Sequence, residues 1–150
     1  MTTHRKKLGI TMGDPAGIGP EIIVKALREK HLYDLCIPVV LADPACMRRA
    51  IDDIVKTPMA LNVISSTEEA KGEPGIMDVL PVTPSPLDGI SLGKVDARCG
   101  DAAFRSVEAA IRLAMSGELD GTVTAPLNKE AMNLAGHHFD GHTEIYATLT

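Results

Sequence analysis

Short apolar runs alternate with segments of helical periodicity along the whole chain. In the helical segments, apolar side chains recur every three or four residues, as on one buried face. The apolar runs predict strands at 8–12, 37–42, 61–64, 76–82 and 119–125. Helices are predicted at 20–30, at 44–55, at 97–117, in a short piece ending near 135, and from 144 onward. This alternation indicates a mainly parallel sheet with helices on both faces, joined by right-handed crossovers.

Two stretches interrupt this pattern. Residues 65–75 are polar and rich in turn residues, and prolines and glycines break any regular element over 83–93. Neither a repeat nor a long linker divides the chain, and its 150 residues are enough for one unit that buries roughly 70% of the surface exposed in the unfolded form. We therefore expect a single three-layer α/β/α unit over residues 1–150.

The connection between the first strand and the first helix is rich in glycine, with Gly13, Gly17 and Gly19 before Pro20. Its spacing, G-x3-G-x-G-P-E, is neither the dinucleotide fingerprint nor a Walker A loop. Glycine permits positive φ and the close approach of another group, and the start of a helix favours anions. The loop is therefore interpreted as part of a ligand site, with a purely structural βα connection as the alternative.

Ligands of open parallel sheets collect beyond the carboxyl ends of the strands. The segments predicted to reach that edge are 13–19, 125–129 and 136–150. Asp14 and Glu21 flank the glycine loop and either position a ligand hydroxyl or cap backbone groups. Lys129 follows a strand and a proline at the same edge, which makes it a candidate catalytic residue, with a solvated lysine as the alternative.

The last segment carries a second pair of candidates. Asp140 and Gly141 form a strong turn signal, and Thr143 is placed to cap a helix that begins at Glu144. His142 and Thr143 then lie side by side at the helix entrance, where an imidazole and a hydroxyl can hydrogen-bond a polar or phosphorylated ligand. The alternative is a capped helix start with an exposed histidine.

A catalytic zinc site is one interpretation of His137, His138 and His142, because such a site has three protein ligands and an open position. All three lie in one short loop, without ordered helical spacing or a carboxylate ligand. No metal site is therefore assigned within this chain.

Bulk properties exclude some classes of partner. A net charge of −5 without a basic run argues against nucleic acid, and no stretch approaches a membrane span. The three scattered cysteines indicate reduced thiols and a cytoplasmic setting, with Cys99 expected as a small buried residue. The basic start, residues 4–7, is expected to be solvated and frayed, and its following apolar run is too short for a signal peptide.

Five motifs together are specific. They are ITMGDPAGIGPEI at 10–22, GK at 93–94, GDAA at 100–103, TAPLNKEA at 124–131 and AGHHFDGHTE at 135–144. In this order, across essentially the whole chain, they closely resemble the 4-hydroxythreonine-4-phosphate dehydrogenase family. That family shares its α/β/α architecture with isocitrate and isopropylmalate dehydrogenases. The resemblance implies the same fold, incomplete in this chain.

The resemblance also implies a reaction. Family members oxidise a hydroxyl β to a carboxylate, using NAD or NADP and a divalent metal, and then decarboxylate the product. In vitamin B6 biosynthesis, 4-phosphooxy-threonine (4-hydroxythreonine 4-phosphate) gives 3-amino-2-oxopropyl phosphate. Other members act on 4-phospho-D-threonate, 4-phospho-D-erythronate or aromatic cis-dihydrodiols, and TAPLNKEA with GHTEIYA is somewhat nearer the phosphothreonate type. A non-catalytic remnant that only keeps these motifs is the alternative from another class.

The resemblance implies roles for particular residues. The family's substrate-binding His-Thr pair corresponds to His142 and Thr143. The glycine loop becomes one wall of the cleft, shared with the cofactor, with contacts from Gly13, Asp14, Gly17 and Gly19. The family's three metal-binding histidines, for Zn, Mg or Co, are expected beyond residue 150, because they lie downstream of the His-Thr pair. We expect the chain to be the amino-terminal part of a homodimeric enzyme for a small phosphorylated hydroxy acid, and to be inactive alone.

Overall fold

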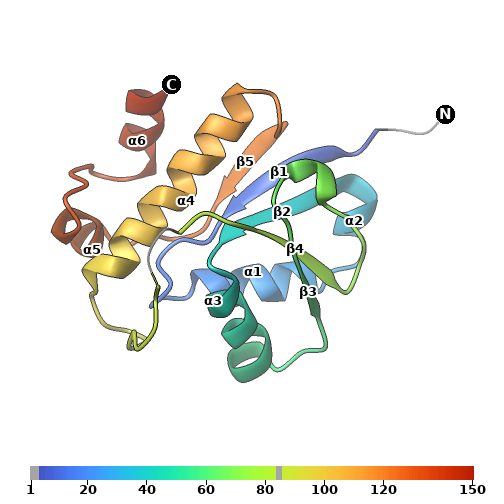
Figure 1. The fold of residues 1–150 in the computed structure, drawn as a ribbon, viewed down its shortest axis with the longest axis horizontal. Helices are drawn as coiled ribbons and strands as arrows, with labels where there is room; N and C mark the ends of the chain where they lie inside the picture. Colours follow the sequence, from blue (N-terminus) through green and yellow to red (C-terminus); the bar gives the residue numbers. More distant parts are fainter. Residues whose placement is uncertain (1–3, 84–85) are drawn as a thin grey trace.

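The computed structural model describes residues 4–83 and 86–150, which form a parallel sheet between helices (Figure 1). The strands are β1 (Lys6–Thr11), β2 (Cys36–Ala42), β3 (Ala60–Val63), β4 (Ile76–Pro81) and β5 (Gly121–Thr124). Their order across the sheet is β3-β4-β2-β1-β5, and every neighbouring pair is parallel. All the predicted strands form, and the three-layer α/β/α architecture is confirmed.

Helices cover both faces of the sheet. The helical elements are α1 (Gly19–Leu27), α2 (Leu32–Leu35), α3 (Pro44–Arg49), the π-helix η1 (Ala50–Val55), the 3-10 helix η2 (Thr67–Glu69), α4 (Ala97–Met115), α5 (Lys129–Leu134) and α6 (His142–Leu149). Helices α1 and α3 with η1 pack on one face. Helix α4 lies across the opposite face, and α5 and α6 pack against α4 (Figure 1).

Strand β2 shows why its sequence is continuously apolar. Val39 and Leu41 belong to the apolar cluster that includes α4, whereas Val40 and Ala42 belong to the cluster with α1 and α3. All four side chains are fully buried. Because neighbouring residues of a strand point to opposite faces, a strand covered on both sides needs an apolar side chain at every position.

The helix predicted over 44–55 forms, but only its first half, α3, is α-helical; it continues as the π-helix η1. Asp43 takes the cap position before Pro44, as expected. Its carboxylate accepts a hydrogen bond from Cys46 Sγ (3.2 Å) instead of from a backbone N–H. The element ends at Lys56 in the left-handed region, with φ of 56°. Helix α2 was not predicted, because four residues are too few to show a periodicity.

Helix α4 ends where its sequence predicts. Gly117 follows the cap residue with φ of 83°, and the N–H of Glu118 donates to the carbonyl of Leu113 (2.9 Å). This is the Schellman arrangement that glycine favours at a helix end. Helix α1 begins and ends slightly earlier than its predicted span.

The expectation of a frayed basic start is wrong for the part of it that is described. Arg5 Nη1 donates to the carbonyls of Tyr33 and Gly72, both at 2.7 Å. The N–H of Lys7 donates to Asp120 Oδ2 at 2.8 Å, and β1 already begins at Lys6. Arg5 thus satisfies two carbonyls that would otherwise lack partners, which fixes the chain ahead of β1. The irregular structure predicted for 83–93 includes residues 84–85, which lie outside the described residues.

Helices α4 and α5 touch at a glycine. A Cβ placed on Gly100 would lie 2.0 Å from the carbonyl oxygen of Ala131 and 2.4 Å from the backbone N of Met132. These atoms belong to the backbone of α5, so they cannot move aside as a flexible side chain would. Gly100 therefore sets how closely the two helices approach.

The order of the strands creates a topological switch point between β1 and β5. From β1 the chain proceeds to β2 on one side, and after α4 it returns to β5 on the other side of β1. Strands β1 and β5 are therefore neighbours whose connections leave toward opposite faces of the sheet. Such a switch point, at the carboxyl ends of the strands, is where open α/β sheets bind ligands.

Candidate functional site

The glycine loop and the turn after β5 meet at this switch point, as expected. The N–H of Asp14 donates to the carbonyl of Pro126 (2.8 Å). Gly13 has φ of 72°, and a Cβ on it would lie 2.3 Å from the same oxygen. A Cβ on Gly19 would lie 2.3 Å from the carbonyl oxygen of Met12. Gly13 and Gly19 are thus required by close backbone contacts within the fold.

Gly17 differs from these two glycines. It is exposed, and a Cβ there would make ordinary contacts of 3.5 Å or more with Asp14. Its N–H and that of Ala16 are already bonded to Asp14, at 3.0 and 2.9 Å. The loop therefore does not offer these two amides to a phosphate. Glu21, on α1, is ion-paired with Lys25 (2.8 Å) and does not cap the loop.

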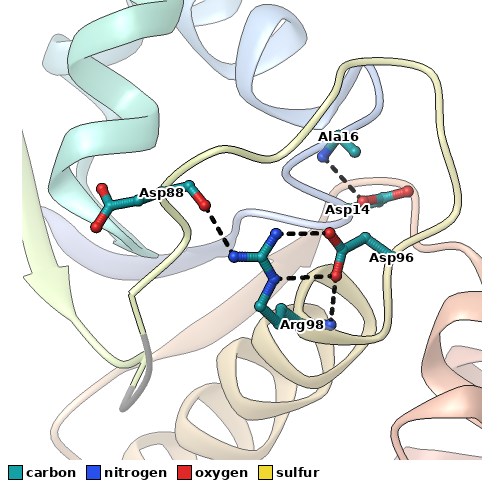
Figure 2. A network of polar contacts seen from close by, with 5 residues as sticks. All are labelled: Asp14, Ala16, Asp88, Asp96 and Arg98. Carbon is teal, nitrogen blue, oxygen red and sulfur yellow. Dashed lines mark hydrogen bonds and ion pairs between the residues drawn. The ribbon is translucent and has the colours of Figure 1, made fainter.

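Asp14 is almost fully buried beside the loop that it stabilises, with 8% of its surface exposed. Figure 2 shows its carboxylate accepting a hydrogen bond from Ala16 and facing Asp96 at the start of α4. Burial raises the pKa of Asp14; the Ala16 hydrogen bond opposes this shift, and the charge of Asp96 adds to it. Ionising Asp14 in the folded protein therefore costs free energy. Carboxyl groups with shifted pKa values of this kind are common at functional sites.

An aspartate–arginine pair fixes the start of α4 next to Asp14. Asp96 caps the helix by accepting from the N–H of Arg98 (2.9 Å), and Arg98 Nη2 donates to its other oxygen (2.9 Å). These hydrogen bonds hold the pKa of Asp96 below its usual range. Arg98 Nη1 also donates to the carbonyl of Asp88 (2.8 Å; Figure 2). The sequence analysis missed this pair, although an aspartate just before a helix is a recognisable cap signal.

Two further contacts at this edge were also missed. Ser106 on α4 donates to the carbonyl of Leu41 (2.6 Å) and accepts from the N–H of Met12 (3.0 Å), so it ties α4 to the ends of β2 and β1. Arg49 on α3 donates to the carbonyl of Pro15 in the glycine loop (3.2 Å). Ser106 thus fixes α4 to the strand ends, and Arg49 fixes α3 to the glycine loop.

Replacing Asp14 by asparagine is expected to raise the free energy of unfolding at pH 7 by about 0.5–1 kcal/mol. Asparagine keeps an oxygen for the Ala16 N–H but carries no charge. Because the folded pKa of Asp14 lies above its usual 3.8, its contribution is present below that pH and is lost as pH rises through the folded pKa. Urea titrations at pH 3.5 and pH 7 measure this, and the gain should vanish at the lower pH.

The matched control for this prediction is Asp96→Asn. The pKa of Asp96 is lowered, so its contribution is present at neutral pH and is lost as pH falls through the folded pKa. This variant should therefore be less stable than the wild type at pH 7. If Asp14→Asn loses stability at pH 7 as Asp96→Asn does, the ionised Asp14 carboxylate is a stabilising group and the prediction is wrong.

His142 is the first residue of α6, and Gly141 takes the cap position. The prediction that Thr143 caps a helix starting at Glu144 is therefore wrong: α6 begins two residues earlier than predicted, and Thr143 is exposed in its first turn. His142 Nε2 is buried and has no hydrogen-bond partner among the described residues. Burial lowers the pKa of His142, so its imidazole is neutral at neutral pH.

The loop that leads to His142 is anchored on α4. The ring of His137 stacks on Phe104, with centroids 3.9 Å apart, and its Nε2 lies 2.8 Å from Asp101 Oδ1. Phe139 stacks on Phe104 as well, at 5.7 Å. His137 is thus engaged by α4, while His138 is exposed. Within residues 4–83 and 86–150, no three His, Cys, Asp or Glu side chains are grouped so as to hold a metal ion.

Lys129 opens α5 directly after Asn128, whose side chain caps that helix by accepting from the N–H of Ala131 (2.9 Å). The lysine is exposed. A Cβ placed on Gly141 would lie 4.0 Å from Lys129 Cε, so the lysine stem runs beside the residue that precedes His142. The start of α5 and the start of α6 therefore lie side by side, with the Lys129 stem next to Gly141.

The arrangement suits a small polar ligand. The imidazole of His142 and the hydroxyl of Thr143 come from α6, and the ammonium of Lys129 comes from α5, which follows the turn that contacts the glycine loop. Cys99 is fully buried behind this edge, as predicted. In the part of the chain that is described, no helix is both long and apolar enough to cross a membrane.

Comparison with known proteins identifies the family. Residues 34–150 match the family described as Pyridoxal phosphate biosynthetic protein PdxA. The chain is 46% identical over 145 residues to a D-threonate 4-phosphate dehydrogenase of Salmonella typhimurium, covering 97% of this chain and 44% of that protein. It is 41% identical over 150 residues to a 4-hydroxythreonine-4-phosphate dehydrogenase of Trichlorobacter lovleyi, covering 99% of this chain and 44% of that one.

A solved structure agrees with these relatives. The crystal structure of a 4-hydroxythreonine-4-phosphate dehydrogenase from Burkholderia phymatum superposes with a TM-score of 0.92 at 40% identity, covering 98% of this chain and 44% of that one. The chain thus spans less than half the length of the relatives it matches. With its parallel sheet, the switch point between β1 and β5, and this match over most of its length, the chain belongs to the PdxA family of pyridoxal phosphate biosynthetic proteins.

Proposed function

We propose that the chain works as the amino-terminal part of a dehydrogenase that oxidises a small 4-phosphorylated hydroxy acid with NAD or NADP. The first candidate substrate is D-threonate 4-phosphate, and the second is 4-hydroxythreonine 4-phosphate. Relatives named for each substrate resemble the chain over nearly its whole length, with somewhat higher identity for the first. The observation that carries the proposal is His142, a neutral imidazole whose buried Nε2 has no hydrogen-bond partner among residues 4–83 and 86–150.

In this proposal the chain's own residues bind and orient the substrate. His142 Nε2 and the Thr143 hydroxyl hydrogen-bond its polar groups. The stack of His137 and Phe139 on Phe104 holds the loop that carries them. A nicotinamide cofactor would supply the hydride acceptor, and the exposed Gly17 would form part of its cleft wall. The residues described here do not complete a metal site, so no step is assigned to a metal.

The remaining properties of the complete enzyme are proposals as well. A divalent metal bound by histidines beyond residue 150, decarboxylation after oxidation, a cytoplasmic location and a homodimer all follow from the family resemblance. The free thiols of Cys36, Cys46 and Cys99 fit a reducing compartment. A remnant that keeps the fold but lacks the reaction is the competing hypothesis.

A substrate screen of the complete enzyme tests the proposal. NAD and NADP reduction is measured with D-threonate 4-phosphate, D-erythronate 4-phosphate, 4-hydroxythreonine 4-phosphate and an aromatic cis-dihydrodiol, each with and without a chelator. We expect the highest kcat/KM with D-threonate 4-phosphate, loss of activity with the chelator, and no turnover by the 150-residue chain alone. Failure of every phosphorylated acid to reduce either cofactor would favour the remnant.

A further inference from the structure

Lys129 lies closer to His142 than its position in the sequence suggests. It belongs to α5, while His142 begins α6, yet the Cε of Lys129 passes the backbone of Gly141 directly before His142. The fold produces this contact because the turn after β5 and the loop after α5 both return to the same edge. The Lys129 stem therefore lies beside the backbone that leads directly into His142 and Thr143.

The charge of Lys129 is not used within the fold. Among residues 4–83 and 86–150, Lys129 forms no ion pair, unlike Lys25 or Arg48. Two other cations near this edge are already engaged: Arg98 pairs with a carboxylate at 2.9 Å, and Arg49 donates to a backbone carbonyl at 3.2 Å. Lys129 thus offers an exposed, uncommitted positive charge.

An anion bound by His142 and Thr143 needs such a charge. The imidazole is neutral at neutral pH, and the Thr143 hydroxyl carries no charge. The carboxylate of Glu144 approaches from the same side, since a Cβ on Gly141 would lie 3.7 Å from its Oε2. A phosphate dianion placed here would meet this negative charge with only neutral donors to hold it. A nearby ammonium would offset the negative charge of Glu144 and attract the phosphate.

We propose that Lys129 is the counter-charge for the phosphate of the substrate held by His142 and Thr143. This inference rests on the proposed function, because it places the phosphate of that substrate between the starts of α5 and α6. A lysine suits the task, since its compact ammonium on a flexible stem binds phosphate as a point charge. Lys129 is then a binding residue, and it takes no part in the transfer of the hydride.

The test uses Lys129→Met, Lys129→Gln and Lys129→Arg in the complete enzyme, with Lys25→Met as the matched control on α1. Steady-state kinetics give KM and kcat for the phosphorylated substrate. Calorimetry gives the Kd of inorganic phosphate and of acetate, and thermal melting checks that each variant is folded. We expect the two neutral variants to raise KM and the phosphate Kd about 10- to 100-fold, with kcat within about threefold. The arginine variant should recover most of the affinity, and Lys25→Met should match the wild type.

Three results would overturn this assignment. They are an unchanged KM and phosphate Kd in folded neutral variants, a loss of kcat at constant KM, and weaker binding of acetate with phosphate binding unchanged. The last result would mean that Lys129 faces a carboxylate. The calorimetry does not require turnover. If the wild type is inactive, the proposed function is rejected, and the phosphate Kd values still show whether Lys129 binds phosphate.

Discussion

Replacing Gly100 by alanine is expected to lower the free energy of unfolding by about 3 kcal/mol or more. The new Cβ would lie 2.0 Å from the carbonyl oxygen of Ala131, so α4 and α5 must move apart. Separation of these helices would also loosen the apolar cluster that contains Met132 and Ile145. In a unit of this size the melting temperature should fall by roughly 6–12 °C. Urea titration followed by circular dichroism measures the change.

Helix propensity makes the sign of this result informative. Alanine is better than glycine inside a helix by about 1 kcal/mol, so without the contact to α5 the substitution would stabilise the protein. The matched control is Gly17→Ala, whose Cβ would make ordinary contacts of 3.5 Å or more; its stability should stay within about 0.5 kcal/mol of the wild type. A Gly100→Ala variant at least as stable as the wild type would show that α5 does not rest against α4 at this residue.

Replacing His142 by alanine in the complete enzyme is expected to lower kcat/KM for the phosphorylated acid about 100-fold, equivalent to about 2.7 kcal/mol. His142 Nε2 is buried and finds no hydrogen-bond partner in the described part of the chain, so a bound substrate is the group that would satisfy it. Without the imidazole, a polar group of the substrate would be left unpaired at a partly buried position. Steady-state kinetics at neutral pH measure the effect.

The control for this prediction is His138→Ala, because His138 is exposed in the same loop. Its kinetics should equal those of the wild type. An effect of His142→Ala no larger than that of His138→Ala would remove His142 from the site.

His142 also affects how the free energy of unfolding depends on pH, which can be measured without catalysis. Its folded pKa lies below the usual 6.5, so the folded state binds fewer protons. Its contribution is therefore present above pH 6.5 and is lost as pH falls through the folded pKa. His142→Ala should remove that part of the pH dependence.

The fold was largely predictable, because its main signals are local. The apolar run of β2 indicates a strand covered on both faces, and Gly117 directly follows Ser116, the residue that caps the end of α4. The exceptions are also physical. The change from α-helix to π-helix at Ala50 leaves the apolar pattern almost unchanged. Arg5 is held in place by hydrogen bonds to carbonyls 28 and 67 residues away in the sequence. Nothing local to Arg5 signals these partners.

The candidate site was predictable only in part. The sequence predicted that the glycine loop, Lys129 and His142 lie at the same edge, because βα loops of a parallel sheet share that edge. It could not separate Gly13, which close packing requires, from Gly17, which is exposed. It also missed Ser106, whose bond to Met12 spans 94 residues. Such contacts depend on how whole helices pack, which no local pattern records.

The place of β1 between β2 and β5 has a consequence for synthesis. A hydrogen bond at the end of this strand pair, from the N–H of Ala125 to Thr11 Oγ1, joins residues 114 positions apart. At ribosomal rates of about 5–20 residues per second, roughly 6–23 s pass between translation of these two residues. During that interval β1 can pair with β2 while its other edge has no strand beside it. That edge of the nascent chain is therefore open to pairing with other chains until β5 is made.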